Sequence, residues 1–289
     1  MLRKNALQLA APRIDEVSAT AAPPNATGPA ARRAGSAATP APAKPVTRNP
    51  VAADCTCPAC AANGLNLCAL GAKAQNAAHP LAAGSADELP MRMARARRTI
   101  SHPRDMSEFV TVICSGWAAS VIALPDGRRQ IASFLLPGDL TCSASLLWPV
   151  AGRLVEAVTD VSYRQVKREH IKAALFNDPV MFEKISILVS AEREQADRLL
   201  VDLGCRAGHE RIARQILYLA QRFAKPDSTK NQMIPFPLRH RHLAEATGLT
   251  SVHVSKVMTE MRRSGIIALD NRVMTITDAS RLREIAHLH

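Results

Sequence analysis

The sequence predicts an α+β protein with an N-terminal antiparallel β-roll, one long helix, and a C-terminal domain of short helices and a hairpin. Three observations lead to this fold class. Short apolar runs separated by Pro, Gly and Asp fill the middle of the 289-residue chain, an amphipathic stretch of helical period follows, and two further amphipathic helices meet at a glycine near the C-terminus. A chain of this length has room for about two folded domains and a tail.

The first part of the chain has the composition of a disordered tail. It is rich in Ala, Pro, Thr and Arg and has no sustained hydrophobic period, so it cannot bury enough apolar surface to offset the entropy lost on ordering. We divide the chain into a tail (1–54), a cysteine-containing sensor segment (55–98), the β-roll (99–178), the long helix (179–204) and the C-terminal domain (205–289).

The predicted roll rests on five short runs of strand-forming residues. Turn-forming residues follow the first three runs: Gly116 after the first, Pro125 to Gly127 after the second, and Pro137 to Asp139 after the third. Several short strands at regular spacing favour a small antiparallel barrel or roll. The runs are Phe109–Cys114, Ala118–Leu124, Gln130–Leu136, Leu154–Val158 and Ser162–Val166.

A long helix is predicted from about Pro179 to Leu203. Apolar residues recur along it at helical spacing, interrupted by polar positions such as Glu192 and Gln195. On a helix of this length between two domains, such a stripe suggests a coiled coil that forms a dimer, and the alternative is a helix packed on its own domain. The stripe consists of Met181, Ile185, Leu188, Leu199 and Leu203.

Two short helices around Gly248 predict a helix-turn-helix. Thr250 or Ser251 can cap the second helix by accepting a backbone N–H bond, and both helices carry an apolar face. The residues expected in the core are Leu243, Ala244 and Ala246 of the first helix and Val254, Val257, Met258 and Met261 of the second.

The first turns of the second helix leave a mainly polar edge that points outward. A helix-turn-helix protein reads base edges in the major groove with this edge. The sequence therefore predicts that the protein binds DNA. The residues expected to contact bases are Ser251, Val252, Ser255 and Lys256.

A β-hairpin is predicted directly after the second helix. Two apolar runs are separated by Asp270 and Asn271, which tolerate left-handed backbone geometry. A helix-turn-helix followed by a hairpin is a winged helix. A plain helical hairpin would not need the basic residues that flank this element, and we expect Arg239, Arg241 and Arg262 to contact phosphates.

The charge of the chain agrees with a nucleic-acid partner. A net charge of +12 and a pI near 9.9 favour a polyanion. There is no apolar run of membrane-spanning length and no signal-peptide pattern, so we expect a cytoplasmic protein without a membrane partner. There is also no nucleophile elbow, phosphate-binding loop or zinc-hydrolase motif, so we do not expect an enzyme.

Five short motifs mark the roll and the winged helix: Ser115-Gly-Trp117, Asp126-Gly-Arg-Arg-Gln-Ile131, Phe134-Leu-Leu-Pro-Gly-Asp139, His209-Glu-Arg-Ile-Ala213 and Gly248-Leu-Thr-Ser-Val-His-Val-Ser-Lys256. Together with the order of the elements, they resemble the CRP/FNR family of bacterial transcription regulators over residues 100–286. The resemblance implies a roll like a cyclic-nucleotide-binding domain, a homodimer formed through the long helix, a two-fold symmetric site on double-stranded DNA, and RNA polymerase as a partner.

The same resemblance disfavours a cyclic nucleotide as the signal. The family's nucleotide sensors use a Gly-Glu pair and an Arg-Ser pair in the roll. Here the segment 137–146 has no glutamate at the usual place, and Arg153 is followed by Leu154.

Four of the seven cysteines lie close together with the spacing C-x-C-x2-C-x7-C. Clustered thiolates bind soft metals, and in a reducing compartment they favour metal or redox chemistry over structural disulfides. An iron–sulfur cluster, which needs four ligands, is one interpretation of these four cysteines. The alternatives are a zinc site, a thiol switch, or no function. The four are Cys55, Cys57, Cys60 and Cys68.

The C-x2-C-x7-C part is similar to the oxygen-sensing branch of the family. Its members hold a [4Fe–4S] cluster with three N-terminal cysteines and a fourth from the roll, and the resemblance implies Cys57, Cys60 and Cys68 as the three. Tyr163 or Arg164 stands where the family has its fourth cysteine. The candidates for the fourth ligand are Cys55, Cys142 and Cys114.

Cys205 stands apart, at the end of the long helix. The neighbouring Arg206 can make its thiol more oxidisable, which marks it as a redox candidate. The alternative is a half-buried cysteine that fills the junction.

Overall fold

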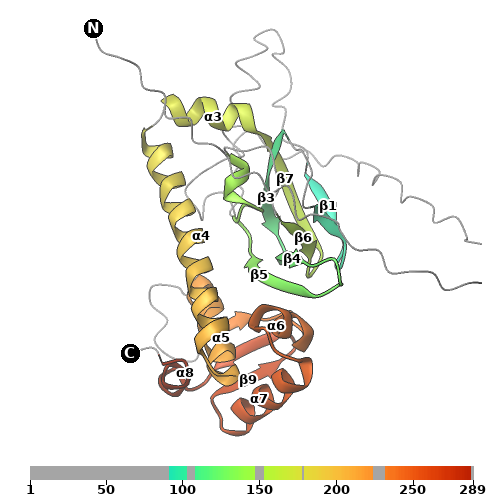
Figure 1. Cartoon of the computed structure of the whole chain (residues 1–289), viewed down its shortest axis with the longest axis vertical. Helices are drawn as coiled ribbons and strands as arrows, with labels where there is room; N and C mark the ends of the chain where they lie inside the picture. The colour runs from blue at the N-terminus through green and yellow to red at the C-terminus, as the bar shows by residue number, and fades with distance from the viewer. Residues whose placement is uncertain (1–90, 103–107, 147–152, 178, 224–231, 288–289) are drawn as a thin grey trace, which may run out of the picture. The chain divides into compact units, whose positions relative to one another are not determined.

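The computed structural model describes residues 91–102, 108–146, 153–177, 179–223 and 232–287 (Figure 1). The predicted tail and the cluster of four cysteines lie outside these residues. No helix in these ranges is both long and apolar enough to cross a membrane.

The roll consists of two antiparallel sheets. One has the order β1-β7-β3 and the other β2-β6-β4-β5. Each of the five predicted strands is present, with ends that differ by at most one residue. The strands are β1 (Arg92–Ala94), β2 (Thr99–Ser101), β3 (Phe109–Ser115), β4 (Ala118–Ala123), β5 (Arg129–Leu135), β6 (Leu154–Ala157) and β7 (Val161–Lys167).

Two short strands were not predicted. β1 pairs with β7, and β2 pairs with β6, so both belong to the roll. β1 therefore lies ahead of residue 99, the predicted start of the roll. Three residues are too few for a period of two to be recognised in a sequence.

The Ser-Gly-Trp motif forms the turn between β3 and β4. Gly116 has a φ of 81°, and a Cβ atom there would lie only 2.1 Å from the carbonyl oxygen of Asp160. Trp117 donates its backbone N–H to Thr159 Oγ1 at 2.9 Å. Only glycine allows the two segments to approach this closely.

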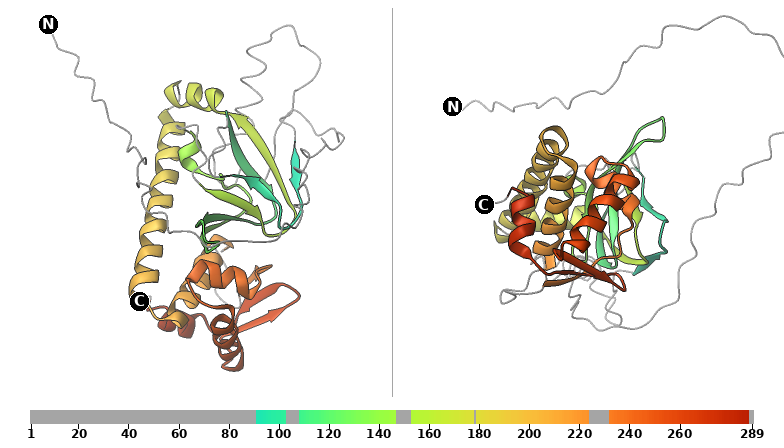
Figure 2. Two further views of the ribbon diagram at one scale, coloured as in Figure 1. Left: turned by 45° about the vertical axis from the view of Figure 1, so that its right-hand side comes forward. Right: turned by 90° about the horizontal axis from the view of Figure 1, so that it is seen from below.

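Helices α3 (Arg168–Asn177) and α4 (Pro179–Cys205) follow the roll. Figures 1 and 2 (left) show α4 as one long continuous helix. Met181 and Ile185 are buried in the same cluster as Val110 and Val166 of the roll, and Leu188 packs against that cluster. The first half of the predicted stripe therefore packs on its own domain, which was the alternative to a dimer contact.

Apolar side chains are also exposed on other sides of α4. Phe182 and Ile187 are each 62% exposed and Leu200 is 70% exposed, so this helix leaves large apolar groups uncovered within the chain. Val180, Val189 and Val201 are also exposed.

The C-terminal domain is a winged helix. Its small sheet has the order β8-β10-β9, with antiparallel pairing throughout. β8 and α8 were not predicted. The elements are α5 (Gly208–Phe223), β8 (Gln232–Pro235), α6 (His240–Thr247), α7 (Ser251–Arg263), β9 (Ile267–Asp270), β10 (Val273–Ile276) and α8 (Ala279–Ile285).

The roll and the winged helix share one hydrophobic core. Trp117 stacks on Phe223 of α5 with ring centroids 5.6 Å apart and 19° between the planes. Phe134 and Ile131 of β5 belong to the same buried cluster as the core of α5, α6 and α7. The β4–β5 face of the roll is therefore the surface on which the winged helix is packed.

Candidate DNA-binding interface

Helix α6, the first helix of the helix-turn-helix, is held at both ends. At its start, His242 Nδ1 accepts the backbone N–H of Arg239 at 3.1 Å, as the third residue of a capping box does. At its end, Gly248 adopts the left-handed conformation with φ 66° and donates its N–H to the carbonyl of Ala244. This left-handed conformation favours glycine, and a Cβ atom there would also lie 2.8 Å from Leu203 Cδ2, so that side chain would have to move.

Helix α7, the second helix, begins at a threonine cap. Thr250 Oγ1 accepts the backbone N–H of His253 at 3.2 Å, so Thr250 and not Ser251 is the cap. The imidazole of His253 lies against the start of α5, because a Cβ atom at Gly208 would come within 2.6 Å of its Nε2. The predicted core residues of both helices are all buried: Leu243, Ala244, Ala246, Val254, Val257, Met258 and Met261.

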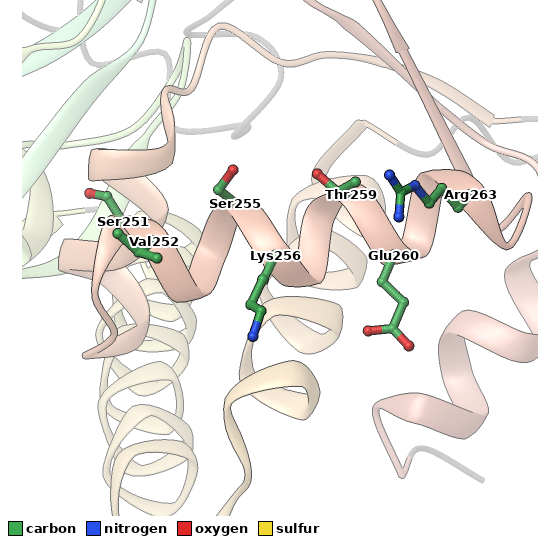
Figure 3. Close-up of a pocket in the computed structure, with 7 residues that line it drawn as sticks. All are labelled: Ser251, Val252, Ser255, Lys256, Thr259, Glu260 and Arg263. Atoms are coloured by element: carbon green, nitrogen blue, oxygen red, sulfur yellow. The ribbon is translucent and has the colours of Figure 1, made fainter.

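The outward face of α7 forms a shallow groove, shown in Figure 3. The structure brings together the four side chains predicted to contact bases: Ser251, Val252, Ser255 and Lys256. Val252 is 75% exposed, so it places an apolar side chain on this surface, open to solvent.

The groove also includes three residues that were not predicted: Thr259, Glu260 and Arg263. They follow the predicted residues at helical spacing, since Thr259 lies four residues after Ser255 and Glu260 four after Lys256. Extending the outward face beyond the first turns would have found them.

The three predicted phosphate contacts are exposed at the ends of the two helices. Arg239 and Arg241 lie at the start of α6, and Arg262 lies in the last turn of α7. Among the described residues, none of the three forms an ion pair with a carboxylate, so their charge is available to a ligand.

The start of α6 is strongly electropositive. Burial lowers the pKa of His242 to about 4, and nearby positive charges act in the same direction. These charges belong to Arg241, Arg239, Arg129 and Arg97. The imidazole is therefore neutral at physiological pH, as its role as a hydrogen-bond acceptor in the capping box requires.

Polar contacts also join the roll to this domain. Arg222 of α5 binds Asp139 with Nη2 and Oδ1 2.7 Å apart. Burial raises the pKa of Asp139, whereas Arg222 and the backbone N–H of Leu136 act against that rise. Gln130 of β5 donates through Nε2 to the carbonyl oxygen of Ala246 in α6 at 3.1 Å.

Arg129 lies at the same junction. It pairs with Glu156 of the roll at 2.6 Å and approaches Glu245 of α6 at 3.6 Å. The side chain therefore bridges the roll and the first helix of the helix-turn-helix.

The structure places the remaining cysteine candidates separately. Cys114 and Cys142 are partly buried free thiols, and Cys205 is an exposed free thiol at the end of α4. In the part of the chain that the structure describes, no three His, Cys, Asp or Glu residues come together as a metal site. The predicted ligands Cys55, Cys57, Cys60 and Cys68 lie outside that part.

The segment that contains Cys142 is tied to the long helix. Ser143, the next residue, donates its hydroxyl to Glu192 Oε2 at 2.6 Å and its backbone N–H to Glu192 Oε1 at 3.2 Å. Cys142 is therefore next to a residue that is hydrogen-bonded to α4.

Comparison with known proteins agrees with this architecture. Residues 210–285 match the Crp-like helix-turn-helix domain. The chain is 29% identical to the nitrogen fixation regulation protein FixK of Azorhizobium caulinodans over 221 residues, which are 75% of this chain and 87% of that protein. It is 30% identical to FixK of Bradyrhizobium diazoefficiens over 166 residues, 56% of this chain and 68% of that protein.

A further relative and a solved structure cover most of the same region. The transcriptional activator protein FnrL of Cereibacter sphaeroides is 27% identical over 66% of this chain and 78% of its own length. The structure of FixK2 from Bradyrhizobium japonicum superposes with a TM-score of 0.61 at 27% identity, covering 68% of this chain and 96% of that one. These relatives are transcription regulators and not enzymes, and the chain belongs to the CRP/FNR family of transcription regulators.

Proposed function

We propose that the protein is a homodimeric, sequence-specific regulator that reads a two-fold symmetric DNA site through helix α7. The observation that carries this proposal is the exposed face of α7, from Ser251 to Arg263, with the exposed arginines Arg239, Arg241 and Arg262 around it. A helix of this kind fits the major groove, and the arginines fit the phosphates on either side.

The side chains on this face suggest how bases are read. Lys256 can donate to O6 or N7 of guanine, although without the two-pronged geometry of arginine. Val252 offers only apolar contact, for which the methyl group of thymine is the natural partner. Ser251 and Ser255 can donate or accept a hydrogen bond.

The dimer is proposed to form through α4. Phe182, Val189 and Leu200 are exposed on this helix and would be covered by the same helix of a second copy. Two α7 helices would then face half-sites about one helical turn of DNA apart. RNA polymerase is the partner through which such a regulator would act on transcription.

The test is selection of duplexes from a random pool by the full-length protein, followed by footprinting. We expect an enriched sequence with two-fold symmetry and protection centred on it. Enrichment of no sequence, or of an asymmetric one bound by a single chain, would refute the proposal.

We also propose that the four N-terminal cysteines form the sensor. The C-x-C-x2-C-x7-C spacing supports a [4Fe–4S] cluster, which would supply oxygen-sensitive redox chemistry when bound. Cys57, Cys60 and Cys68 would hold it together with Cys55, Cys142 or Cys114. Of these, Cys114 and Cys142 are free thiols, so neither is committed to a disulfide.

Anaerobic purification followed by iron, sulfide and zinc analysis tests this sensor. Broad visible absorption that disappears in air, with stoichiometric iron and sulfide, is the expected result. Zinc in a colourless protein would replace the cluster by a structural or thiol-redox site. A colourless, metal-free protein that cannot be reconstituted would refute a metal sensor and leave cysteine oxidation, at Cys205 for example, as the alternative.

A further inference from the structure

The turn between β1 and β2 carries a cluster of arginines. The segment Arg92-Met-Ala-Arg-Ala-Arg-Arg98 places Arg92, Arg95, Arg97 and Arg98 at the surface, and all four are exposed. No carboxylate in the described ranges forms an ion pair with any of them. By contrast, Arg128 in the β4–β5 turn is paired with Asp126 at 2.7 Å.

The turn is held in place by four hydrogen bonds from backbone N–H groups. Arg98 donates its N–H to the carbonyl of Arg95 at 3.0 Å, and Arg97 donates to the carbonyl of Ala157 at 2.7 Å. Ala157 in turn donates to the carbonyl of Arg98 at 2.9 Å, and Ala96 donates to Asp160 Oδ1 at 2.8 Å. The arginine side chains therefore extend from a fixed backbone.

Arg97 occupies a conformation that normally favours glycine. Its φ is 70°, in the left-handed region that other L-residues enter at an energetic cost. Neighbouring segments already hold the backbone there, so glycine would form the same turn without that cost. A strained residue that keeps a long charged side chain at the surface points to a function for that side chain.

The turn lies within electrostatic reach of the start of α6. Arg97 is one of the arginines whose charge acts on His242, together with Arg239 and Arg241 of α6 itself. Charges interact strongly across water only within about 10 Å at moderate salt. Geometry also places the turn beside α6: Arg97 donates its N–H to the carbonyl of Ala157, and the neighbouring Glu156 binds Arg129, which approaches Glu245 of α6 at 3.6 Å. Exposed arginines therefore lie on both sides of the junction between the roll and the winged helix.

We propose that the β1–β2 turn is a second phosphate-binding surface, which holds the DNA backbone outside the base pairs read by α7. Guanidinium groups bind phosphate through two parallel hydrogen bonds, and such contacts add affinity without adding sequence preference. DNA is favoured over an acidic protein because the turn lies beside α6, whose exposed Arg239 and Arg241 flank the proposed DNA-reading helix. This inference rests on the proposed DNA binding.

The experiment compares two lengths of duplex with full-length protein. One duplex contains only the selected site, and the other extends it by about one helical turn (~10 base pairs) on each side. The test variant is Arg95→Ala with Arg98→Ala, and the matched control, Lys167→Ala with Lys172→Ala, removes two charges near α3. Fluorescence anisotropy gives Kd and its salt dependence.

On the long duplex we expect the test variant to bind about 10-fold more weakly, and the slope of log K against log salt to fall by about 0.9 for each phosphate that is no longer neutralised. The control should change neither. On the short duplex both variants should bind like the parent. Arg97→Gly should also weaken binding to the long duplex without lowering the Tm.

Other outcomes overturn the inference in separate ways. Equal loss of affinity on both duplexes would place these arginines at the read site. Unchanged binding on both would exclude a phosphate surface, and a simultaneous loss of transcription activation in a purified system would point to an acidic surface on RNA polymerase. Failure of the parent protein to bind any selected duplex would instead refute the proposed function.

Discussion

Lys256 is the residue on which sequence recognition depends most in the proposed interface. It is exposed in the middle of the α7 groove and can donate to guanine. We expect Lys256→Ala to weaken binding to the selected site by about 1–3 kcal/mol, and to weaken binding to unrelated DNA much less. Titration of both duplexes at one salt concentration measures this difference. Lys256→Arg, which restores the charge with a fork of donors, should keep guanine at the contacted position.

His242 makes the stability of the DNA-binding domain depend on pH. Its pKa is lowered to about 4 in the folded state from an ordinary 6.5, so the unfolded chain takes up the proton first. The contribution of His242 to the free energy of unfolding should therefore be fully present above about pH 6.5 and be lost as the pH falls towards 4. Urea unfolding at pH 7.5 and pH 5 should differ by about 1–2 kcal/mol from this residue.

The variant His242→Gln provides the control for that measurement. Glutamine at this position of a capping box accepts the same backbone N–H but does not titrate. The pH difference should shrink by the amount that His242 contributes. If the difference in the free energy of unfolding between pH 7.5 and pH 5 were the same in this variant, groups other than His242 would cause it.

At single positions, the sequence predicted buried residues better than backbone conformations. The helical period located every core residue of α7, because the period follows directly from burial. The hairpin turn was predicted with left-handed residues at Asp270 and Asn271, but the structure has them at Asn271 (φ 46°) and Arg272 (φ 62°). The position of the turn depends on the register of β9 and β10, in which Val273 lies opposite Asp270 and leaves Asn271 and Arg272 as the loop.

At the level of elements, strands of six or seven residues were predictable from alternation, whereas three of the short strands were missed. β3, β4, β5 and β7 are long enough for alternation to show, and the four-residue strands β6, β9 and β10 were predicted from apolar runs. β1, β2 and β8, with three or four residues each, were not predicted. These short strands exist because a distant partner supplies their hydrogen bonds. β1, for example, pairs with β7 about 70 residues later in the chain.

Helix α4 carries a buried apolar face and an exposed apolar face, the second of which is the proposed dimer contact. Met181 and Ile185 pack on the roll, whereas Phe182 and Leu200 are exposed. We expect Leu200→Glu to convert the dimer into a monomer with little change in the stability of the chain itself, because a charge cannot be buried between two helices without cost. Sedimentation velocity measures the mass. If the variant remained a dimer, the dimer contact would not lie on the face of α4 that carries Leu200.

Met181→Ala should behave in the opposite way. Truncation of this buried side chain removes packing within one chain and should lower the free energy of unfolding by about 2–4 kcal/mol. The dimer should survive at temperatures where the chain is folded. The pair of variants therefore separates assembly from folding on one helix.

The Arg222–Asp139 pair joins two elements that are far apart in sequence. Arg222→Ala leaves the carboxylate of Asp139 mostly buried without its cation, and we expect a decrease of about 1–3 kcal/mol in the free energy of unfolding, measured by chemical denaturation. Arg128→Ala is the matched control, since Arg128 and Asp126 are 78% and 50% exposed and such pairs contribute little. If both variants lowered the free energy of unfolding equally, the Arg222–Asp139 pair would contribute no more to stability than the exposed pair.

For the whole molecule, the order of roll, long helix and winged helix was predictable, whereas the sensor stays a prediction. The order follows from successive changes of hydrophobic period along the chain. A cluster of cysteines identifies soft-metal or thiol chemistry, but the choice of metal depends on ligands brought together from distant segments. Tyr163 and Arg164 on β7 show the difficulty, because they stand where the oxygen-sensing branch would be expected to have its fourth cysteine.

The common core of the roll and the winged helix limits how such a regulator can be rebuilt. Trp117 and Phe134 would be exposed to water in a chimera that joined this roll to an unrelated DNA-binding domain. The face of α7 that is proposed to contact DNA, by contrast, shares no side chain with that core. Operator preference can therefore change by substitution on α7 alone, whereas transplantation of the reading domain requires its new host to supply a matching β4–β5 surface.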